Sequence, residues 1–181
     1  MDPHPALELI ATAVPAGAAT WADFGAGEGT FTRALAARLG RDGVVYAIDR
    51  DARALATLRA RAEPADARVI TVHADFARDT ELGELAAATL DGLLFANSLH
   101  YVSDAGAVLA RLVARLAPGG RVVVIEYDRR RANPWVPHPI PPARLAEIAV
   151  AAGLAPPRLT ATRPSSYGGD LYAAVAGRVP G

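Results

Sequence analysis

The chain has 181 residues, enough for one domain with a hydrophobic core of its own, and we expect no second domain. Its 19 basic and 19 acidic residues cancel, so no overall field favours nucleic acid or an anionic membrane, and a small or neutral partner is favoured. The absence of cysteine excludes disulfides, thiolate zinc sites and a cysteine nucleophile.

The first 19 residues are predicted to contain a short helix. Asp2 can cap this helix, Pro3 fits its first turn, and Pro15 and Gly17 end it. The start of the chain is acidic where a secretion signal would be basic, and no apolar run is long enough to span a membrane. We therefore expect a cytoplasmic protein with no membrane partner.

Residues 21–31 read Trp-Ala-Asp-Phe-Gly-Ala-Gly-Glu-Gly-Thr-Phe. This pattern predicts a short strand, a turn with three alternating glycines, and the start of a helix over residues 30–39. Gly25 and Gly27 let the backbone turn sharply and let a ligand approach more closely than a Cβ atom would permit. The turn is a candidate site for an adenosine-bearing molecule, and a glycine-rich turn without a ligand is the alternative.

The residues around the turn discriminate between ligands. A dinucleotide fingerprint has a glycine at its sixth position, where this chain, counted from Gly25, has Thr30. Asp23 and Glu28 would repel a pyrophosphate, but they suit a ligand that carries ammonium and sulfonium charges, as S-adenosylmethionine does. A nicotinamide-dependent oxidoreductase is therefore the disfavoured alternative.

This stretch resembles the first motif of the class I S-adenosylmethionine-dependent methyltransferases, hydrophobic-Asp/Glu-hydrophobic-Gly-x-Gly-x-Gly. The resemblance implies S-adenosylmethionine as the cofactor, bound near Asp23 and at the turn formed by Gly25, Ala26 and Gly27. It also implies an α/β fold: a single Rossmann-like doubly wound domain with a seven-stranded, mostly parallel sheet. The implied strand order is 3-2-1-4-5-7-6, with one antiparallel strand.

The second strand, Val44 to Ile48, is a continuous apolar run, as expected of a parallel strand covered on both faces. It ends at Asp49, about 20 residues past the last glycine, where an acid can accept hydrogen bonds from both ribose hydroxyls. Arg50 follows in the same cofactor-binding loop. The alternative role for Asp49 is to cap the next helix, and both roles are compatible.

A helix over residues 52–62 and a third strand over residues 68–72 lead to Asp75 and Phe76. The resemblance implies that Asp75 hydrogen-bonds the adenine amino group and that Phe76 helps to cover the ring. Ordinary packing is the alternative for Phe76. A further helix is expected over residues 80–88.

The fourth strand begins at Asp91 and runs into the polar segment Asn97-Ser-Leu-His-Tyr101. This stretch is similar to the family's fourth motif. The similarity implies that Asn97 contacts the methionine part of the cofactor and that Ser98, His100 and Tyr101 lie on the substrate side.

A general base is needed only if the methyl acceptor carries a proton. His100 and Tyr101 are the leading catalytic candidates, followed by His138 and Asp128. For His100, a hydrogen-bonding role in the wall of the pocket is the alternative.

An amphipathic helix capped by Asp104 is expected to end at residues 118–120, before a strongly apolar strand over residues 121–127. The order of helix, Leu-Ala-Pro-Gly-Gly-Arg and buried strand is again that of the methyltransferase core. Four motifs in the family's order strengthen the resemblance.

The proline-rich segment over residues 129–142 is predicted to form a wall of the substrate pocket. Trp135 and His138 could face the substrate, although a tryptophan often fixes a loop to the body of a domain. The arginines at 129–131 could bind an anionic group or form a solvated face.

A helix over residues 144–152 and an antiparallel pair over residues 158–162 and 171–176 complete the predicted sheet. The expected parts of the single domain are the N-terminal helix (1–19), the cofactor-binding core (20–128), the proline-rich loop (129–142), and the C-terminal helix with the antiparallel edge (143–181).

The sequence thus predicts methyl transfer to a small-molecule acceptor. The Asn/Asp-Pro-Pro-aromatic segment of base-amino methyltransferases is absent at Asn97 to His100, so we expect no nucleic-acid partner. No cluster of acids and histidines suggests a metal. The short N-terminal region leaves a thin lid, which a homodimer could complete. A domain that binds the cofactor without catalysis is the alternative function.

Overall fold

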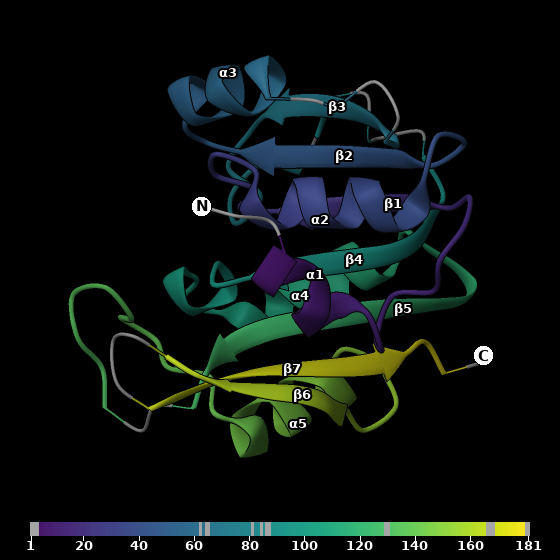
Figure 1. Cartoon of the computed structure of the whole chain (residues 1–181). Helices are drawn as coiled ribbons and strands as arrows, with labels where there is room; N and C mark the ends of the chain where they lie inside the picture. Colours follow the sequence, from purple (N-terminus) through teal and green to yellow (C-terminus); the bar gives the residue numbers. More distant parts are fainter. Residues whose placement is uncertain are drawn as a thin grey trace.

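The computed structural model describes residues 4–61, 63, 66–80, 82–83, 85, 88–128, 131–165 and 169–179. A single seven-stranded sheet runs through the molecule in the order β3-β2-β1-β4-β5-β7-β6 (Figure 1). The strands are β1 Thr20–Phe24, β2 Val44–Asp49, β3 Arg68–His73, β4 Leu90–Ala96, β5 Leu116–Tyr127, β6 Arg158–Pro164 and β7 Asp170–Gly177. The helices are α1 His4–Ile10, α2 Thr30–Leu39, α3 Ala52–Ala60, α4 Ala105–Val113 and α5 Pro142–Ala151.

The first five strands pair in parallel, and β7 is antiparallel to both of its neighbours, β5 and β6. The predicted α/β fold, strand order and single antiparallel strand are therefore confirmed. The chain leaves β1 toward β2 on one side, and β4 lies on the other side of β1. Open α/β sheets bind their ligands at this kind of switch in strand order, beyond the carboxyl ends of the strands.

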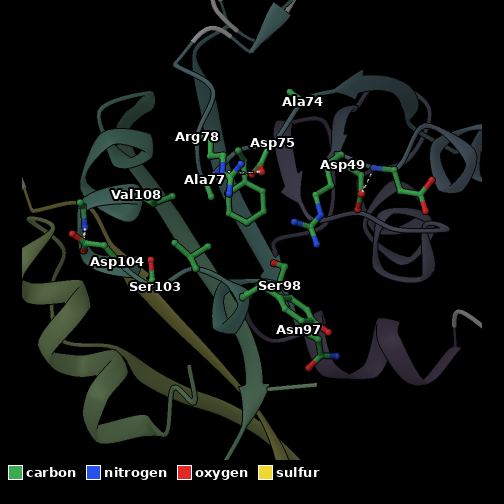
Figure 2. A pocket seen from close by; sticks show the side chains of 17 residues that line it. Asp49, Ala74, Asp75, Ala77, Arg78, Asn97, Ser98, Ser103, Asp104 and Val108 are labelled. Atoms are coloured by element: carbon green, nitrogen blue, oxygen red, sulfur yellow. Dashed lines mark hydrogen bonds and ion pairs between the residues drawn. The ribbon is translucent and has the colours of Figure 1, made fainter. Parts of the chain in front are cut away.

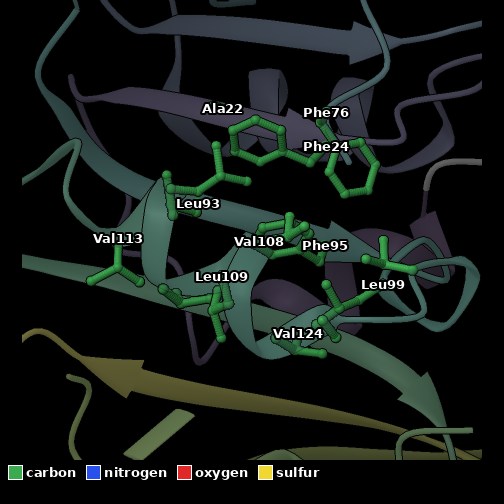
Figure 3. Packing of buried hydrophobic residues seen from close by; sticks show 14 of the residues in the cluster. Ala22, Phe24, Phe76, Leu93, Phe95, Leu99, Val108, Leu109, Val113 and Val124 are labelled. Carbon is green, nitrogen blue, oxygen red and sulfur yellow. The ribbon is translucent and has the colours of Figure 1, made fainter. Parts of the chain in front are cut away.

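Two hydrophobic clusters cover the two faces of the sheet. On one face, α1 and α2 pack against alternate residues of the central strands, such as Trp21 and Val45. On the other face, α4 and α5 cover the intervening residues of the strands, including Phe24 and Phe95 near the carboxyl ends of β1 and β4 (Figure 3). Burial on both faces explains why the central strands are continuous apolar runs.

Several predicted boundaries are corrected. The helix expected to reach residues 118–120 ends at Val113, because the Arg115 carbonyl accepts the Leu90 amide hydrogen and Leu116 already pairs with β4 as the start of β5. Helix α5 begins at Pro142, since proline is tolerated in a first helical turn, and β6 and β7 extend beyond their predicted ends.

Some expectations lie outside the described residues. These are the cap at Asp2 and Pro3, the arginines at 129 and 130, and much of the helix predicted over residues 80–88. None of the described helices is long and apolar enough to span a membrane.

Candidate active site

Hydrogen bonds fix the glycine turn after β1 to the end of the neighbouring strand β2. The amides of Gly25 and Ala26 donate to the Ile48 carbonyl at 2.8 and 3.0 Å, and the Gly27 amide donates to Asp49 Oδ2 at 2.7 Å. Gly25 and Gly27 have φ values of +83° and +53°, which favour glycine. A Cβ atom on Gly25 would also lie only 2.4 Å from the Ser98 Cβ, so this position has no room for a side chain.

Asp49 holds the loop that faces the glycine turn. Its Oδ1 accepts the Asp51 amide hydrogen at 2.8 Å while Oδ2 binds the turn. The cap of α3 is Asp51, whose carboxylate accepts the amides of Arg53 and Ala54, so the alternative capping role belongs to Asp51 and not to Asp49.

A first cavity of about 670 Å³ opens beyond the carboxyl ends of β1 to β4. Asp49 and Asp75 line it from the ends of β2 and β3, and Asp104 and Val108 line it from the start of α4 on the opposite side (Figure 2). Eight predicted site residues line this cavity: Gly25, Asp49, Arg50, Asp75, Phe76, Asn97, Ser98 and Tyr101. Asp23, Ala26 and Gly27 are not among its lining residues.

Asp75 and Phe76 begin the loop after β3. Asp75 Oδ1 accepts the Ala77 amide hydrogen at 3.0 Å. The centroid of the Phe76 ring lies 5.7 Å from that of Phe24, and Phe76 also lines the first cavity, so this residue both packs in the core and borders the cavity. Arg111 of α4, whose role the sequence analysis missed, fixes this loop by donating to the Phe76 carbonyl.

Asp23 lies beneath the turn, within the core. Its side chain is buried, and Oδ2 accepts a hydrogen bond from the Thr32 hydroxyl at 2.6 Å. Desolvation raises the pKa of Asp23 to about 7, and the nearby Asp49 carboxylate adds to the rise, whereas the Thr32 hydrogen bond opposes it. Glu28, the other acid of the motif, is exposed and pairs with Arg61 at 3.2 Å.

Asn97, just after β4, is the only described residue other than glycine with a positive φ, at 53°. Its amide donates to the Ile125 carbonyl at 2.8 Å, which ties the segment to β5. Among the described residues, four buried side-chain atoms have no hydrogen-bond partner, and all four belong to predicted site residues: Asp23 Oδ1, Asn97 Oδ1, Ser98 Oγ and His100 Nε2. Buried polar groups are normally paired, so these atoms are candidates for hydrogen bonds to a ligand.

A second cavity of about 620 Å³ adjoins the first, and Asn97 and Tyr101 line both. Its other lining residues are His100, Tyr127, Asn133, Trp135 and Val136. Ser98 lines the first cavity and not the second. His138 lines neither cavity, but its amide donates to the His100 carbonyl at 3.0 Å and so joins the proline-rich segment to this wall.

His100 is paired with a buried acid that the sequence analysis did not select. Glu126 Oε2 lies 2.6 Å from His100 Nδ1, and Oε1 accepts the His100 amide hydrogen at 3.1 Å. Both side chains are 1% exposed. A glutamate within the apolar run of β5 was a signal in the sequence, because a charge buried in a strand needs a partner.

The methyltransferase domain family matches residues 22–120, more than half of the chain. The chain belongs to this family. A search of curated proteins gives a 40% identical match over 92 residues to the ribosomal RNA small subunit methyltransferase H of Verminephrobacter eiseniae, covering 50% of this chain and 26% of that protein. The chain thus spans about a quarter of that relative.

Solved structures of methyltransferases share the whole fold. The 1,6-didemethyltoxoflavin-N1-methyltransferase of Burkholderia thailandensis, solved with bound 1,6-didemethyltoxoflavin and S-adenosylhomocysteine, is 25% identical with a TM-score of 0.74, covering 98% of this chain and 78% of that one. An arsenic(III) S-adenosylmethionine methyltransferase from Chlamydomonas reinhardtii is 19% identical with a TM-score of 0.72, covering 93% and 67%. In this methyltransferase domain, no group of three or more potential metal ligands occurs among the described residues.

Proposed function

We propose that this methyltransferase domain binds S-adenosylmethionine in the first cavity and transfers its methyl group to a small molecule in the second. The observation that carries the proposal is the junction of the two cavities at Asn97 and Tyr101. A donor and an acceptor that occupy adjoining cavities can meet at a shared wall, and methyl transfer depends mainly on such positioning.

The described residues fit the donor. The unpartnered Asn97 Oδ1 would accept from the ammonium group of its methionine part, and Asp49 can still accept from the ribose hydroxyls, because each carboxylate oxygen has two lone pairs. Asp75 would bind the adenine amino group, with Phe76 against the ring. Bound S-adenosylmethionine supplies an activated methyl group.

The glycine turn would lie against the donor. A Cβ atom on Gly27 would meet nothing within 4 Å, so this part of the backbone is open to a ligand, whereas Ala26 is buried. Asp23 would act from beneath the turn, where it accepts a hydrogen bond from the Thr32 hydroxyl, and the exposed Arg50 borders the cavity.

On the acceptor side, His100 is the proposed base and Tyr101 borders both molecules. Trp135 would form the outer wall, because its side chain is 76% exposed beside the second cavity. Ser98 would line the donor cavity where it adjoins the acceptor cavity. His138 would hold the wall in place through the hydrogen bond from its amide to the His100 carbonyl.

Calorimetric titration with S-adenosylhomocysteine tests the donor site, and transfer of a labelled methyl group from S-adenosylmethionine to a panel of small molecules tests the activity. Tight binding without transfer to any acceptor would favour the non-catalytic alternative. Thermal stabilisation by NAD alone would contradict the proposal.

The curated relative named as a ribosomal RNA methyltransferase makes RNA the competing acceptor. The zero net charge favours a small molecule, since RNA binding relies on basic surfaces. Label transfer to small-subunit ribosomal RNA, with none to the small-molecule panel, would overturn our choice of acceptor.

A further inference from the structure

We propose that the acceptor is a planar aromatic molecule with an acidic ring O–H or N–H group, and that Glu126 positions His100 to remove that proton. This inference rests on the proposed function, because it assigns the second cavity to the acceptor. It adds the acceptor's chemical class and a role for a buried acid that touches neither cavity.

The walls of the second cavity favour a flat ring. Four of its seven lining residues carry aromatic rings: His100, Tyr101, Tyr127 and Trp135. Apart from His100, none of these lining residues is acidic or basic. Rings of this kind stack on aromatic molecules, whereas a strongly charged acceptor would lose its hydration without gaining an ionic partner.

The His100–Glu126 pair sets the orientation and the tautomer of the imidazole. Glu126 Oε1 already accepts the His100 amide hydrogen, and Oε2 lies 2.6 Å from Nδ1, so Nδ1–H donates a hydrogen bond to the carboxylate. In a neutral imidazole, Nε2 is then the free acceptor. Because Glu126 lines neither cavity while His100 lines the second, we infer that the ring edge bearing Nε2 is directed to the acceptor.

Nε2 is shielded and has no hydrogen-bond partner among the described residues. The centroid of the Tyr101 ring lies 4.3 Å from that of the imidazole, and Tyr101 is more than half exposed, so we assign it as the group that covers Nε2. The acceptor reaches Nε2 when Tyr101 turns aside. The base is then dry and ready to accept a proton, which strengthens its hydrogen bond to the acceptor.

The proton and electron balance closes without another reactant. The acceptor's O–H or N–H bond breaks and its proton passes to Nε2, while Nδ1–H keeps its hydrogen bond to Glu126. The acceptor atom then bonds to the methyl carbon, and the sulfur keeps the electron pair of the broken S–C bond. Glu126 stabilises the imidazolium until the proton on Nε2 passes to solvent.

Binding can be tested independently of turnover, because the chain has two tryptophans. Trp21 is 1% exposed in the core, whereas Trp135 borders the second cavity. In the presence of S-adenosylhomocysteine, 2-naphthol and 8-hydroxyquinoline should quench tryptophan emission, and Trp135→Leu should remove the quenching. Cyclohexanol and spermidine do not quench tryptophan, so their binding is measured by calorimetry, which should detect none. Equal binding of these non-aromatic probes, or no binding of the aromatic ones, would overturn the acceptor class.

Turnover with the best aromatic probe tests Glu126. Glu126→Gln should lower kcat by about 10²-fold or more with little change in KM, because the amide can present its NH₂ group to Nδ1 and favour the wrong tautomer. His100→Gln should cost at least as much, and imidazole should restore part of the activity of His100→Ala. The matched control is Glu147→Gln, at an exposed position on α5, which should retain full activity.

The outcomes separate this inference from the proposed function. If neither S-adenosylmethionine nor its product binds, both proposals fail. If the donor binds and only non-aromatic acceptors are methylated, the proposed function stands and this inference fails. A kcat within twofold of the parent in Glu126→Gln would reject the positioning role, and if that variant does not fold, the same threshold applies to His100→Gln.

Discussion

Replacing Asp23 by asparagine should change how stability depends on pH. The pKa of this carboxyl group is raised from its ordinary value of 3.8 to about 7, mainly because burial disfavours the charged form. Between these two values the unfolded chain releases the proton while the folded protein keeps it, so the free energy of unfolding falls as the pH rises. Below both pKa values, burying Asp23 costs no free energy of unfolding by this route. Above the folded pKa, the loss is constant at about 4 kcal/mol.

The asparagine variant keeps an oxygen that can accept from the Thr32 hydroxyl but has no proton to release. The difference in unfolding free energy, variant minus parent, should therefore rise by about 2.5 kcal/mol between pH 5 and pH 8 and level off beyond it. Urea denaturation followed by circular dichroism at each pH measures this difference. Asp42→Asn, at an exposed turn after α2, is the control and should give a flat difference. A flat difference for Asp23→Asn as well would refute the reasoning.

Three further predictions concern the glycine turn and its neighbours. Gly25→Ala would place a methyl group 2.4 Å from the Ser98 Cβ, so urea denaturation should show that the free energy of unfolding falls by about 2–3 kcal/mol. An unchanged midpoint would contradict this steric limit. Asp49→Ala should weaken S-adenosylhomocysteine binding in calorimetry by about 1.5–3 kcal/mol, and unaltered affinity would remove Asp49 from the site. Asn97→Gly and Asn97→Ala both remove the amide oxygen, so each variant should bind S-adenosylhomocysteine about tenfold more weakly. The alanine variant should be about 1 kcal/mol less stable than the glycine variant, because alanine disfavours the positive φ at this position. Equal stabilities would dismiss strain at residue 97.

The positions of Asp49 and Asp75 could be predicted because each follows an apolar strand, and parallel strands bring their carboxyl ends to one edge of the sheet. The strand order came from the resemblance to a family, since the motifs appeared in that family's order. These inferences need only the direction of each strand and the residue that ends it.

The depth and orientation of side chains were not predictable in the same way. Asp23 belongs to the glycine motif, yet it points into the core toward Thr32, which depends on how α2 packs against β1. The pairing of His100 with Glu126 depends on the pairing of β4 with β5, which brings residues 26 positions apart into contact. Such contacts depend on the packed fold and not on local sequence patterns.

The segment after β4 combines features that would each destabilise an ordinary loop. Asn97 has a left-handed backbone, and Asn97, Ser98 and His100 each bury a polar atom without a partner in the described part of the chain. An unpartnered buried polar atom costs about 1–3 kcal/mol, so the surrounding structure must hold the segment in place. The Asn97 amide donates to β5, Glu126 accepts the His100 amide hydrogen, and the rings of Phe24 and Phe95 stack at the ends of the adjoining strands. Because these atoms are already desolvated, a ligand that reaches them gains their hydrogen bonds without removing their water, so the cost built into the fold becomes affinity for the ligand.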